Sequence, residues 1–384
     1  LSLVAAAPFF LIAEILNSLI LQITGVFNLS QWAEIRLPHY SGAGRILYFV
    51  YFLPLIMITM KLLDWNPFVL KRQPITLRSA FPFAGLLLFA ALIVFHPFSA
   101  PFPDGNLRVD FLDVGQGDCA LITMPTGETI LIDGGGRPGF SQTVILREGE
   151  TPEAFTPDVP NIGENVVSAF LWERGYSRID YLLATHPDTD HIQGLGDVAE
   201  NFEIGAAIVA RTPSRDPDFA SFLHILERRE VPLIVAALGN KLSFGGVRIE
   251  MISPEAVENA DFPQSNDDSL VYRIVFGETA ILFTGDIEKS TERRLIERPG
   301  DLRADVVKVA HHGSRTSSTE EFVAASQAKA AIISVGRRSQ FGHPHPEVVE
   351  RWESIGAKVL RTGETGTISL VSDGKTLKLT TFKK

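Results

Sequence analysis

Four possible metal ligands stand within six residues, directly after an apolar strand. The strand reads IDYLLAT (179–185), and the segment that follows it carries His186, Asp188, Asp190 and His191. Only a tight turn at a strand end can direct alternating side chains of so short a segment at one point. Clustered imidazoles and carboxylates are costly to collect unless a cation compensates them. The segment therefore predicts a metal-binding loop at the edge of a β-sheet.

Three further apolar strands end in polar residues of the same kind. Asp133 closes LIDGGG, Asp286 closes LFTGD, and His311 and His312 close VVKVAHH. Taken singly, an Asp in such a place is commonly a turn former or a helix cap, and a lone His is usually only hydrogen-bonded. Glycines accompany each of them and allow close backbone approach. Their coincidence predicts one shared site for two metal ions.

The charge distribution divides the chain in two. Residues 1–100 carry six Lys and Arg against three Asp and Glu, which leaves 29 basic and 42 acidic side chains in the remainder. The proline-rich run HPFSAPFPDG at 96–105 prevents a helix or a β-strand from continuing through it. We therefore expect a membrane domain over 1–100 and a soluble domain over 101–384.

Three apolar segments in the first domain are expected to span a membrane. They cover roughly 3–24, 46–63 and 80–98, near the ~20 residues that a bilayer core requires. The second and third have uninterrupted apolar cores of only about fifteen residues, so an interfacial or re-entrant placement stays open. Because an apolar stretch begins at once at Leu1, we expect a piece of a longer membrane protein.

Basic residues predict the orientation of these segments. The connection between the last two carries four of them (Lys61, Lys71, Arg72 and Arg78), and positive loops remain cytoplasmic. The soluble domain then lies on the non-cytoplasmic side.

The first segment also has a polar stripe at helical spacing, formed by Glu14, Asn17, Ser18 and Gln22. A carboxylate at membrane depth usually faces a bundle interior or a water-filled path, which makes Glu14 a candidate channel residue. A helix lying at the interface, with Glu14 in water, is the alternative.

The sequence pattern of the soluble domain predicts two half-domains of similar plan. Apolar runs indicate strands, and helices are indicated at 165–175, at about 288–297, between 312 and 330, and after 336, followed by closing strands to residue 384. Two sheets packed face to face with helices outside follow from this plan. A loop insertion is expected over 137–161. The strands are expected at 107–114, 118–124, 128–135, 179–186, 246–253, 269–277, 279–286, 304–312 and 330–336.

Six motifs in order resemble those of a known family. FLDVGQGD, LIDGG, THPDTDH, LFTGD, VAHHGS and FGHPHPEV are similar to the carboxyl-terminal metallo-β-lactamase-type domain of the ComEC family of DNA-internalisation channels. The preceding helices resemble the end of that family's membrane competence domain. The resemblance implies an α/β fold, an αββα sandwich preceded by about three transmembrane helices, in a multi-pass protein of the bacterial plasma membrane. It also implies a channel for a single DNA strand, with other competence proteins as partners.

The resemblance assigns roles to the polar residues of the motifs. It implies two divalent metal ions. One is held by His186 and Asp188 and the other by Asp190 and His191, with Asp286 bridging and His311 completing the second position. His312 is the less favoured of that pair, and Asp133 would orient a ligand imidazole.

The chain departs from the wider superfamily at two ligand positions. Asp188 stands where a second His is common, and a lone His before the bridging Asp is replaced by SNDDS, with Asn266, Asp267 and Asp268. Oxygen ligands suit Mn²⁺ or Mg²⁺ better than Zn²⁺. We therefore favour Mn²⁺, with Zn²⁺ as the alternative.

Residues outside these ligand motifs complete the predicted rim. His343 and His345 lie in a turn fixed by prolines, where His345 could stabilise an oxyanion or protonate a leaving oxygen, unless the turn is only structural. Asp113, Gln116 and Asp118 could line the same rim. Lys308 and Arg315 could meet phosphates, although isolated surface bases are the commoner explanation.

A two-metal site predicts phosphodiester hydrolysis, with Asp190, Asp286 and His345 as catalytic residues. With the family resemblance, this implies a nuclease that degrades the non-transforming DNA strand outside the membrane. The acidic balance argues in part against it, because nonspecific DNA binders are usually basic. An inactive domain that guides DNA and a hydrolase of a small phosphodiester are the alternatives. The lone Cys119 excludes an internal disulfide and a multi-thiolate metal site.

Overall fold

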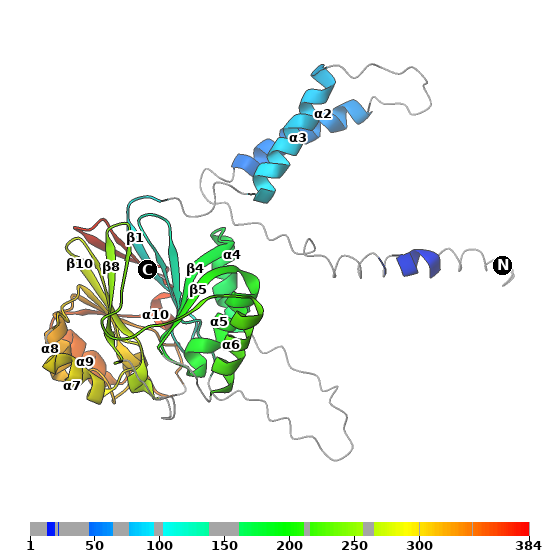
Figure 1. The fold of residues 1–384 in the computed structure, drawn as a ribbon. Helices are drawn as coiled ribbons and strands as arrows, with labels where there is room; N and C mark the ends of the chain where they lie inside the picture. The colour runs from blue at the N-terminus through cyan, green and yellow to red at the C-terminus, as the bar shows by residue number, and fades with distance from the viewer. Residues whose placement is uncertain are drawn as a thin grey trace, which may run out of the picture. The chain divides into compact units, whose positions relative to one another are not determined.

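The computed structural model of the protein describes residues 14–19, 22, 46–63, 77–95, 103–137, 161–210, 216–255, 265–298, 300–339 and 341–383. The chain forms two compact units, Leu1–Pro97 and Phe98–Lys384 (Figure 1).

The amino-terminal unit is helical where it is described. Residues 14–19 form helix, with Glu14 exposed, and two longer helices follow, α2 (Ile46–Leu63) and α3 (Leu77–Phe95). They coincide with the second and third predicted spans. Among the described residues, however, no helix combines the length and the apolarity needed to cross a bilayer. Most of the first predicted span lies outside the described residues.

Two β-sheets organise the described part of the second unit. The first has eight strands in the order β15-β14-β1-β2-β3-β4-β5-β6, and the second has seven in the order β13-β12-β11-β10-β9-β8-β7. The first sheet comprises β1 (Leu107–Phe111), β2 (Ala120–Thr123), β3 (Thr129–Ile132), β4 (Arg178–Ala184), β5 (Glu203–Val209), β6 (Leu233–Val235), β14 (Ile368–Ser372) and β15 (Leu377–Thr381). The second comprises β7 (Lys241–Phe244), β8 (Val247–Ser253), β9 (Val271–Phe276), β10 (Thr279–Phe283), β11 (Val306–Lys308), β12 (Ala330–Ile333) and β13 (Lys358–Arg361).

Helices cover the outer face of each sheet (Figure 1). The first sheet is covered by η2 (Gly163–Ser168), α4 (Ala169–Glu173), α5 (Thr189–Asn201) and α6 (Pro217–Arg228). The second is covered by α7 (Lys289–Glu297), α8 (Glu320–Ser326) and α9 (Pro346–Ser354). Short turns of helix complete the unit: η3 (Asn266–Asp268), η4 (Ala310–Gly313) and α10 (Thr362–Thr365). The predicted αββα sandwich is thus confirmed.

The apolar core explains why the strands pack in this way. Side chains from both sheets meet between them, where Phe283 stacks on Phe111 with ring centroids 5.4 Å apart and on Tyr272 at 5.0 Å. Central strands such as β10 are buried on both faces, whereas β8 alternates between buried and more exposed residues. This pattern is typical of strands covered by a second sheet on one side and by helices on the other.

Most predicted elements coincide with observed ones. The predicted strands correspond to β1 to β4 and to β8 to β12, and the closing strands to β13 to β15. The four predicted helices correspond to η2 with α4, to α7, to α8 and to α9. No helix or strand was predicted for residues 187–245, which form α5, β5, α6, β6 and β7. Nearly all of the predicted insertion at 137–161 lies outside the described residues.

The amino-terminal end of α5 lies unusually close to the loop after β3. Gly134 N donates to His191 O at 2.7 Å, and Gly194 N donates to Gly135 O at 3.0 Å. A Cβ on Gly194 would stand 2.0 Å from the carbonyl oxygen of Gly134. Only a glycine permits this contact between backbones.

Substitution of Gly194 by Ala should therefore destabilise the protein. We expect Gly194→Ala to lower the free energy of unfolding by about 1–3 kcal/mol, because the added methyl group forces two backbones apart. Denaturant unfolding would measure it. Gly196→Ala is the matched control in the same helix, since its Cβ would meet only Ile225 Cδ1 at 3.3 Å. Equal effects of the two substitutions would contradict the proposed role of the backbone contact.

Candidate metal centre

Adjacent strand ends bring the polar motifs to one rim. β3 runs parallel to β4, and β10 runs parallel to β11. The carboxyl ends of parallel strands meet at one edge of their sheet. Asp133 and His186 therefore follow neighbouring strands of the first sheet, while Asp286 and the pair His311 and His312 follow neighbouring strands of the second.

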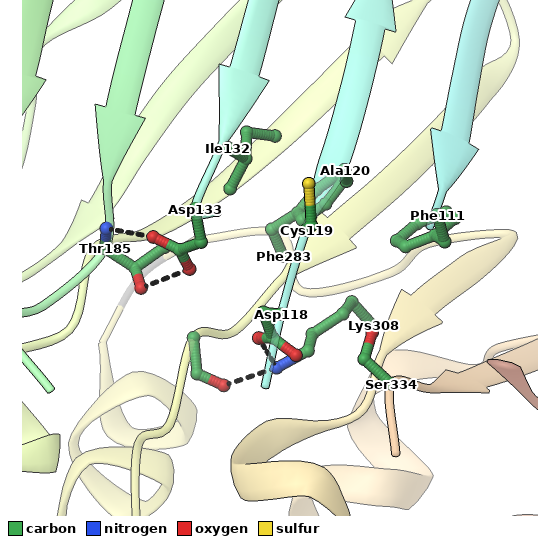
Figure 2. Close-up of a pocket in the computed structure, with 11 residues that line it drawn as sticks. Phe111, Asp118, Cys119, Ala120, Ile132, Asp133, Thr185, Phe283, Lys308 and Ser334 are labelled. Atoms are coloured by element: carbon green, nitrogen blue, oxygen red, sulfur yellow. Dashed lines mark hydrogen bonds and ion pairs between the residues drawn. The ribbon is translucent and has the colours of Figure 1, made fainter. Parts of the chain in front are cut away.

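Three imidazoles are held by hydrogen bonds at Nδ1. His191 Nδ1 lies 2.9 Å from Asp133 Oδ2, His312 Nδ1 lies 2.8 Å from Ser334 O, and His186 Nδ1 lies 3.0 Å from Thr185 Oγ1. The Thr185 hydroxyl donates to Asp133 Oδ2 at 2.7 Å, so it accepts from His186 (Figure 2). Each Nδ1 thus carries the proton, which leaves each Nε2 as the free ligand atom.

The three Nε2 atoms are buried and make no hydrogen bond. They face carboxylates nonetheless. Asp286 Oδ2 lies 3.3 Å from both His191 Nε2 and His312 Nε2, and Asp190 Oδ2 lies 3.3 Å from His312 Nε2. Buried polar atoms without partners are rare in folded proteins. Their convergence on carboxylate oxygens is the geometry expected around cations.

The electrostatics of the cluster point the same way. Burial opposes the charged form of His191 and His312, but nearby carboxylates, above all Asp286, raise the pKa of both well above the ordinary value. Burial likewise opposes ionisation of Asp286, yet His312 and His191 hold its pKa well below its usual range. The imidazoles and carboxylates thus stabilise one another's charged forms, and a cation bound among them would stabilise the carboxylates in the same way.

Four overlapping triads bring possible ligand atoms within 4.8 Å of one another: His186, His191 and Asp286; Asp190, His191 and His312; Asp118, Asp286 and His312; and Asp118, Asp133 and His191. Because His191 has a single free Nε2, it can bind only one ion. Each triad combines imidazole nitrogen with carboxylate oxygen, a donor set that suits divalent transition metals. The residues present therefore fit a divalent metal centre.

His312 occupies the place that the sequence assigned to His311. Both adopt left-handed backbone, with φ 49° at His311 and 53° at His312. This turn directs His312 into the buried cluster. His311 remains partly exposed, with Nδ1 3.6 Å from Glu288 Oε1, and it belongs to none of these triads. Sequence alone does not distinguish two consecutive histidines whose directions are set by the turn.

The other predicted ligand substitutes lie at the edge of the cluster. Asp188 is about half exposed, with Oδ2 3.7 Å from His186 Nε2. In SNDDS, Asn266 Nδ2 approaches the ring nitrogens of His311 at 3.4–3.5 Å. Asp268 instead accepts from Ser265 N and closes its own turn. Asn266 is therefore the member of SNDDS that faces the rim.

Asp267 also turns away from the rim. Its carboxylate accepts from Glu288 N at 2.9 Å and from the Ser290 hydroxyl, next to the start of α7.

The DVGQGD turn contributes unequally to the rim. Asp118 is buried in the cluster, and its Oδ1 lies 3.3 Å from His312 Nδ1. Asp113 accepts from Gly115 N and shapes the turn. Gln116 Oε1 accepts from Ser339 Oγ at 3.2 Å, which joins this turn to the loop after β12.

That loop carries the two remaining histidines. The ring of His343 lies 5.8 Å from that of His311 and 5.3 Å from that of His345. Burial and the neighbouring His312 lower the pKa of His343 to about 4, so it is neutral at neutral pH. His345 is partly exposed and precedes α9.

Lys308 and Arg315 do not stand free to meet phosphates. Lys308 is buried in the cluster, where Nζ pairs with Asp118 and Asp286. Arg315 pairs with Glu347 at 2.8 Å. A lysine that ends an apolar strand beside two histidines is the sequence signal that could have indicated burial of Lys308.

The two adjacent histidines provide a direct test of the centre. We expect His312→Ala to bind fewer divalent cations per chain, because its Nε2 faces Asp190 and Asp286. His311→Ala should keep the cation content of the unsubstituted protein. Elemental analysis after dialysis measures the number of divalent cations bound per chain, and thermal unfolding verifies that each variant is folded. Loss of cations in His311→Ala alone would contradict the assignment.

Comparison with known proteins agrees with this architecture. The family model of the metallo-beta-lactamase superfamily matches residues 112–337. The chain is 31% identical over 277 residues to "ComE operon protein 3" of Bacillus subtilis, covering 72% of this chain and 34% of that protein. It is 29% identical to "Competence protein ComA" of Neisseria gonorrhoeae, covering 74% and 34%. It is also 26% identical to "Recombination protein 2" of Haemophilus influenzae, covering 90% and 37%.

The chain thus spans about a third of the length of these relatives. The sandwich fold, the His and Asp clusters and the match to the family model agree with one another. The resemblance to the ComEC family is likewise confirmed by its competence homologues. The protein therefore belongs to the metallo-beta-lactamase superfamily of metal-dependent hydrolases and is a homologue of the ComEC-type competence proteins.

Proposed function

We propose that the carboxyl-terminal unit is a metal-dependent phosphodiesterase that cleaves DNA during DNA uptake. The observation that carries the proposal is the convergence of buried Nε2 atoms without a hydrogen bond on carboxylates: those of His191 and His312 face Asp286 and Asp190, and that of His186 faces Asp188. Competence-related homologues make DNA the substrate class to expect. We further propose that this unit degrades the non-transforming strand.

The metal ligands and the two histidines of the nearby loop have different proposed roles in catalysis. Two divalent cations held here would activate a water and stabilise the charge that develops on the phosphoryl oxygens. Asp190 and Asp286 orient the ligand set. His343 is neutral at neutral pH because burial lowers its pKa to about 4, so it can accept a hydrogen bond. The ring of His345 lies 5.3 Å from that of His343 and is partly exposed. His345 is the proposed donor of a proton to the leaving oxygen.

Manganese is the cation that we propose for this centre. Asp188 replaces an imidazole at the mouth of the cluster, and Asn266 places an amide near His311. Asp188, Asp190 and Asp286 place three carboxylates beside the three imidazoles, and oxygen ligands favour Mn²⁺ over Zn²⁺.

Cleavage of DNA tests the proposal. The purified chain with Mn²⁺ should cut single-stranded DNA, and Asp190→Ala should be inactive because it removes a carboxylate that faces His312. Gel analysis of labelled oligonucleotides measures both. Asp268→Ala is a suitable control, since its carboxylate caps a turn outside the triads. Absence of cleavage with any divalent ion would refute the nuclease and leave the guiding role. Cleavage of bis(4-nitrophenyl) phosphate without cleavage of DNA would indicate a small substrate.

The amino-terminal unit suggests a membrane setting for this activity. Large apolar side chains are exposed on α2 and α3, with Phe49 and Phe81 each 74% exposed and Leu87 72% exposed. Exposed apolar surface of this kind marks contact with lipid or another protein. We propose that this unit belongs to a membrane channel, with Glu14 on its polar path and the hydrolase unit on the non-cytoplasmic side. Other competence proteins are the proposed partners.

Two arginines provide a place for a DNA backbone near the centre. Arg337 and Arg338 are exposed in the loop that also carries His343 and His345. In the part of the chain that the structure describes, neither makes an ion pair with a carboxylate, whereas Arg315 pairs with Glu347. Ser339 anchors the loop to Gln116. A local basic site of this kind can offset the acidic balance of the chain.

Removal of these charges should weaken DNA binding and leave the chemistry intact. We expect Arg337→Gln with Arg338→Gln to raise KM for single-stranded DNA and to reduce the slope of log Kd against log salt by about 1.4, because two phosphate contacts are lost. Activity on bis(4-nitrophenyl) phosphate should not change. Arg315→Gln serves as the control. An unaltered salt dependence would exclude the loop from DNA binding.

A further inference from the structure

Lys308 is a buried ammonium at the base of the cluster. It is the last residue of β11, where it pairs in register with Phe283 of β10, and its side chain is 3% exposed. The lining of the small cavity around it is largely apolar and includes Phe111, Ala120 and Ile132 (Figure 2). A charge in such surroundings must be compensated by nearby opposite charge.

The ammonium is bound on three sides by acceptors. Lys308 Nζ donates to Gly285 O at 3.1 Å and pairs with Asp286 Oδ1 at 3.5 Å. It also contacts Asp118 Oδ2 (Figure 2). Gly285 and Asp286 are consecutive, so one cation engages both the backbone and the side chain of this turn. These contacts leave Lys308 no access to a phosphate.

The two oxygens of Asp286 therefore have different partners. Oδ1 faces Lys308 Nζ at 3.5 Å. Oδ2 faces His191 Nε2 and His312 Nε2, each at 3.3 Å. A carboxylate without such a constraint can rotate and present either oxygen, or both, to a cation. Lys308 removes that freedom.

We propose that Lys308 is a positioning residue that retains Asp286 Oδ1 and thereby leaves Oδ2 as the oxygen that faces His191 and His312, where a cation would be held. Asp118 supplies the charge that allows the ammonium to be buried. This inference rests on the proposed two-cation centre and adds to it a built-in cation from the chain itself. Lys308 then acts through Asp286 and does not touch the substrate.

Cation binding by charge-matched variants tests the proposal. Lys308→Met keeps the length of the side chain and removes the ammonium. We expect it to bind Mn²⁺ roughly 10–100-fold more weakly at one of two positions, as is typical when the partner of a ligand is lost. Titration calorimetry with Mn²⁺ alone measures affinity and stoichiometry. The electron paramagnetic resonance spectrum should change from that of a coupled manganese pair towards that of isolated ions.

A second variant separates positioning from the effect of an unpaired Asp118. Lys308→Met combined with Asp118→Asn removes the buried pair together, so it avoids a lone buried carboxylate and protects the fold. It is compared with Asp118→Asn alone, because Asp118 itself lies 3.3 Å from His312 Nδ1. The weakened binding should persist in the double variant, because Asp286 Oδ1 still lacks its partner. Lys329→Met, which removes a lysine from an exposed pair with Asp305, is the control for the substitution itself.

The opposite outcomes overturn the proposal. If Lys308 only repelled bound cations, its removal would tighten Mn²⁺ binding in both variants. If it were only a packing residue, affinity and spectrum would remain those of the unsubstituted protein. Failure of the nuclease is distinguishable, because a chain that binds two cations but cleaves no DNA leaves the role of Lys308 intact.

Discussion

The candidate metal centre depends on backbone hydrogen bonds that fasten the start of α5 to two neighbouring turns. Asp118 N donates to the carbonyl of Asp190 at 3.2 Å, and Gly134 N donates to the carbonyl of His191 at 2.7 Å. Because these bonds join main chain to main chain, the positions of the ligand-bearing residues do not depend on side-chain rotamers. Glycine at 134 is needed for this approach, since a Cβ there would meet Leu195 N at 2.3 Å.

Once that backbone is fixed, a second layer of contacts sets the chemistry. Asp133 receives hydrogen bonds from Thr185 and from His191 Nδ1, and Ser334 O receives one from His312 Nδ1. Each bond directs an Nε2 lone pair into the centre. Lys308 does the equivalent for Asp286 by engaging one of its oxygens. Such supporting contacts govern both the geometry and the basicity of metal ligands.

Sequence reasoning succeeded where periodicity and order carry the information. The alternating strands, the αββα plan and the sequence of motifs were all predictable, because each depends on local patterns. It failed at residues 187–245, where glycines for close packing interrupt the helical pattern of α5. It also preferred His311, whereas a left-handed turn directs His312 inward. Burial of Lys308 escaped it because the compensating Asp118 lies far away in the chain.

The sequence alone determined which residue types were available for a metal centre and at which strand ends they would stand. It did so because hydrophobic periodicity and turn residues act over a few neighbouring positions. Tertiary structure decided which histidine enters the centre, which oxygen of Asp286 faces the imidazoles, and which lysine balances the carboxylates. Those choices depend on contacts between segments distant in sequence, such as Asp118 with Lys308. Such contacts form, and stabilise the protein, only after the two sheets have packed together.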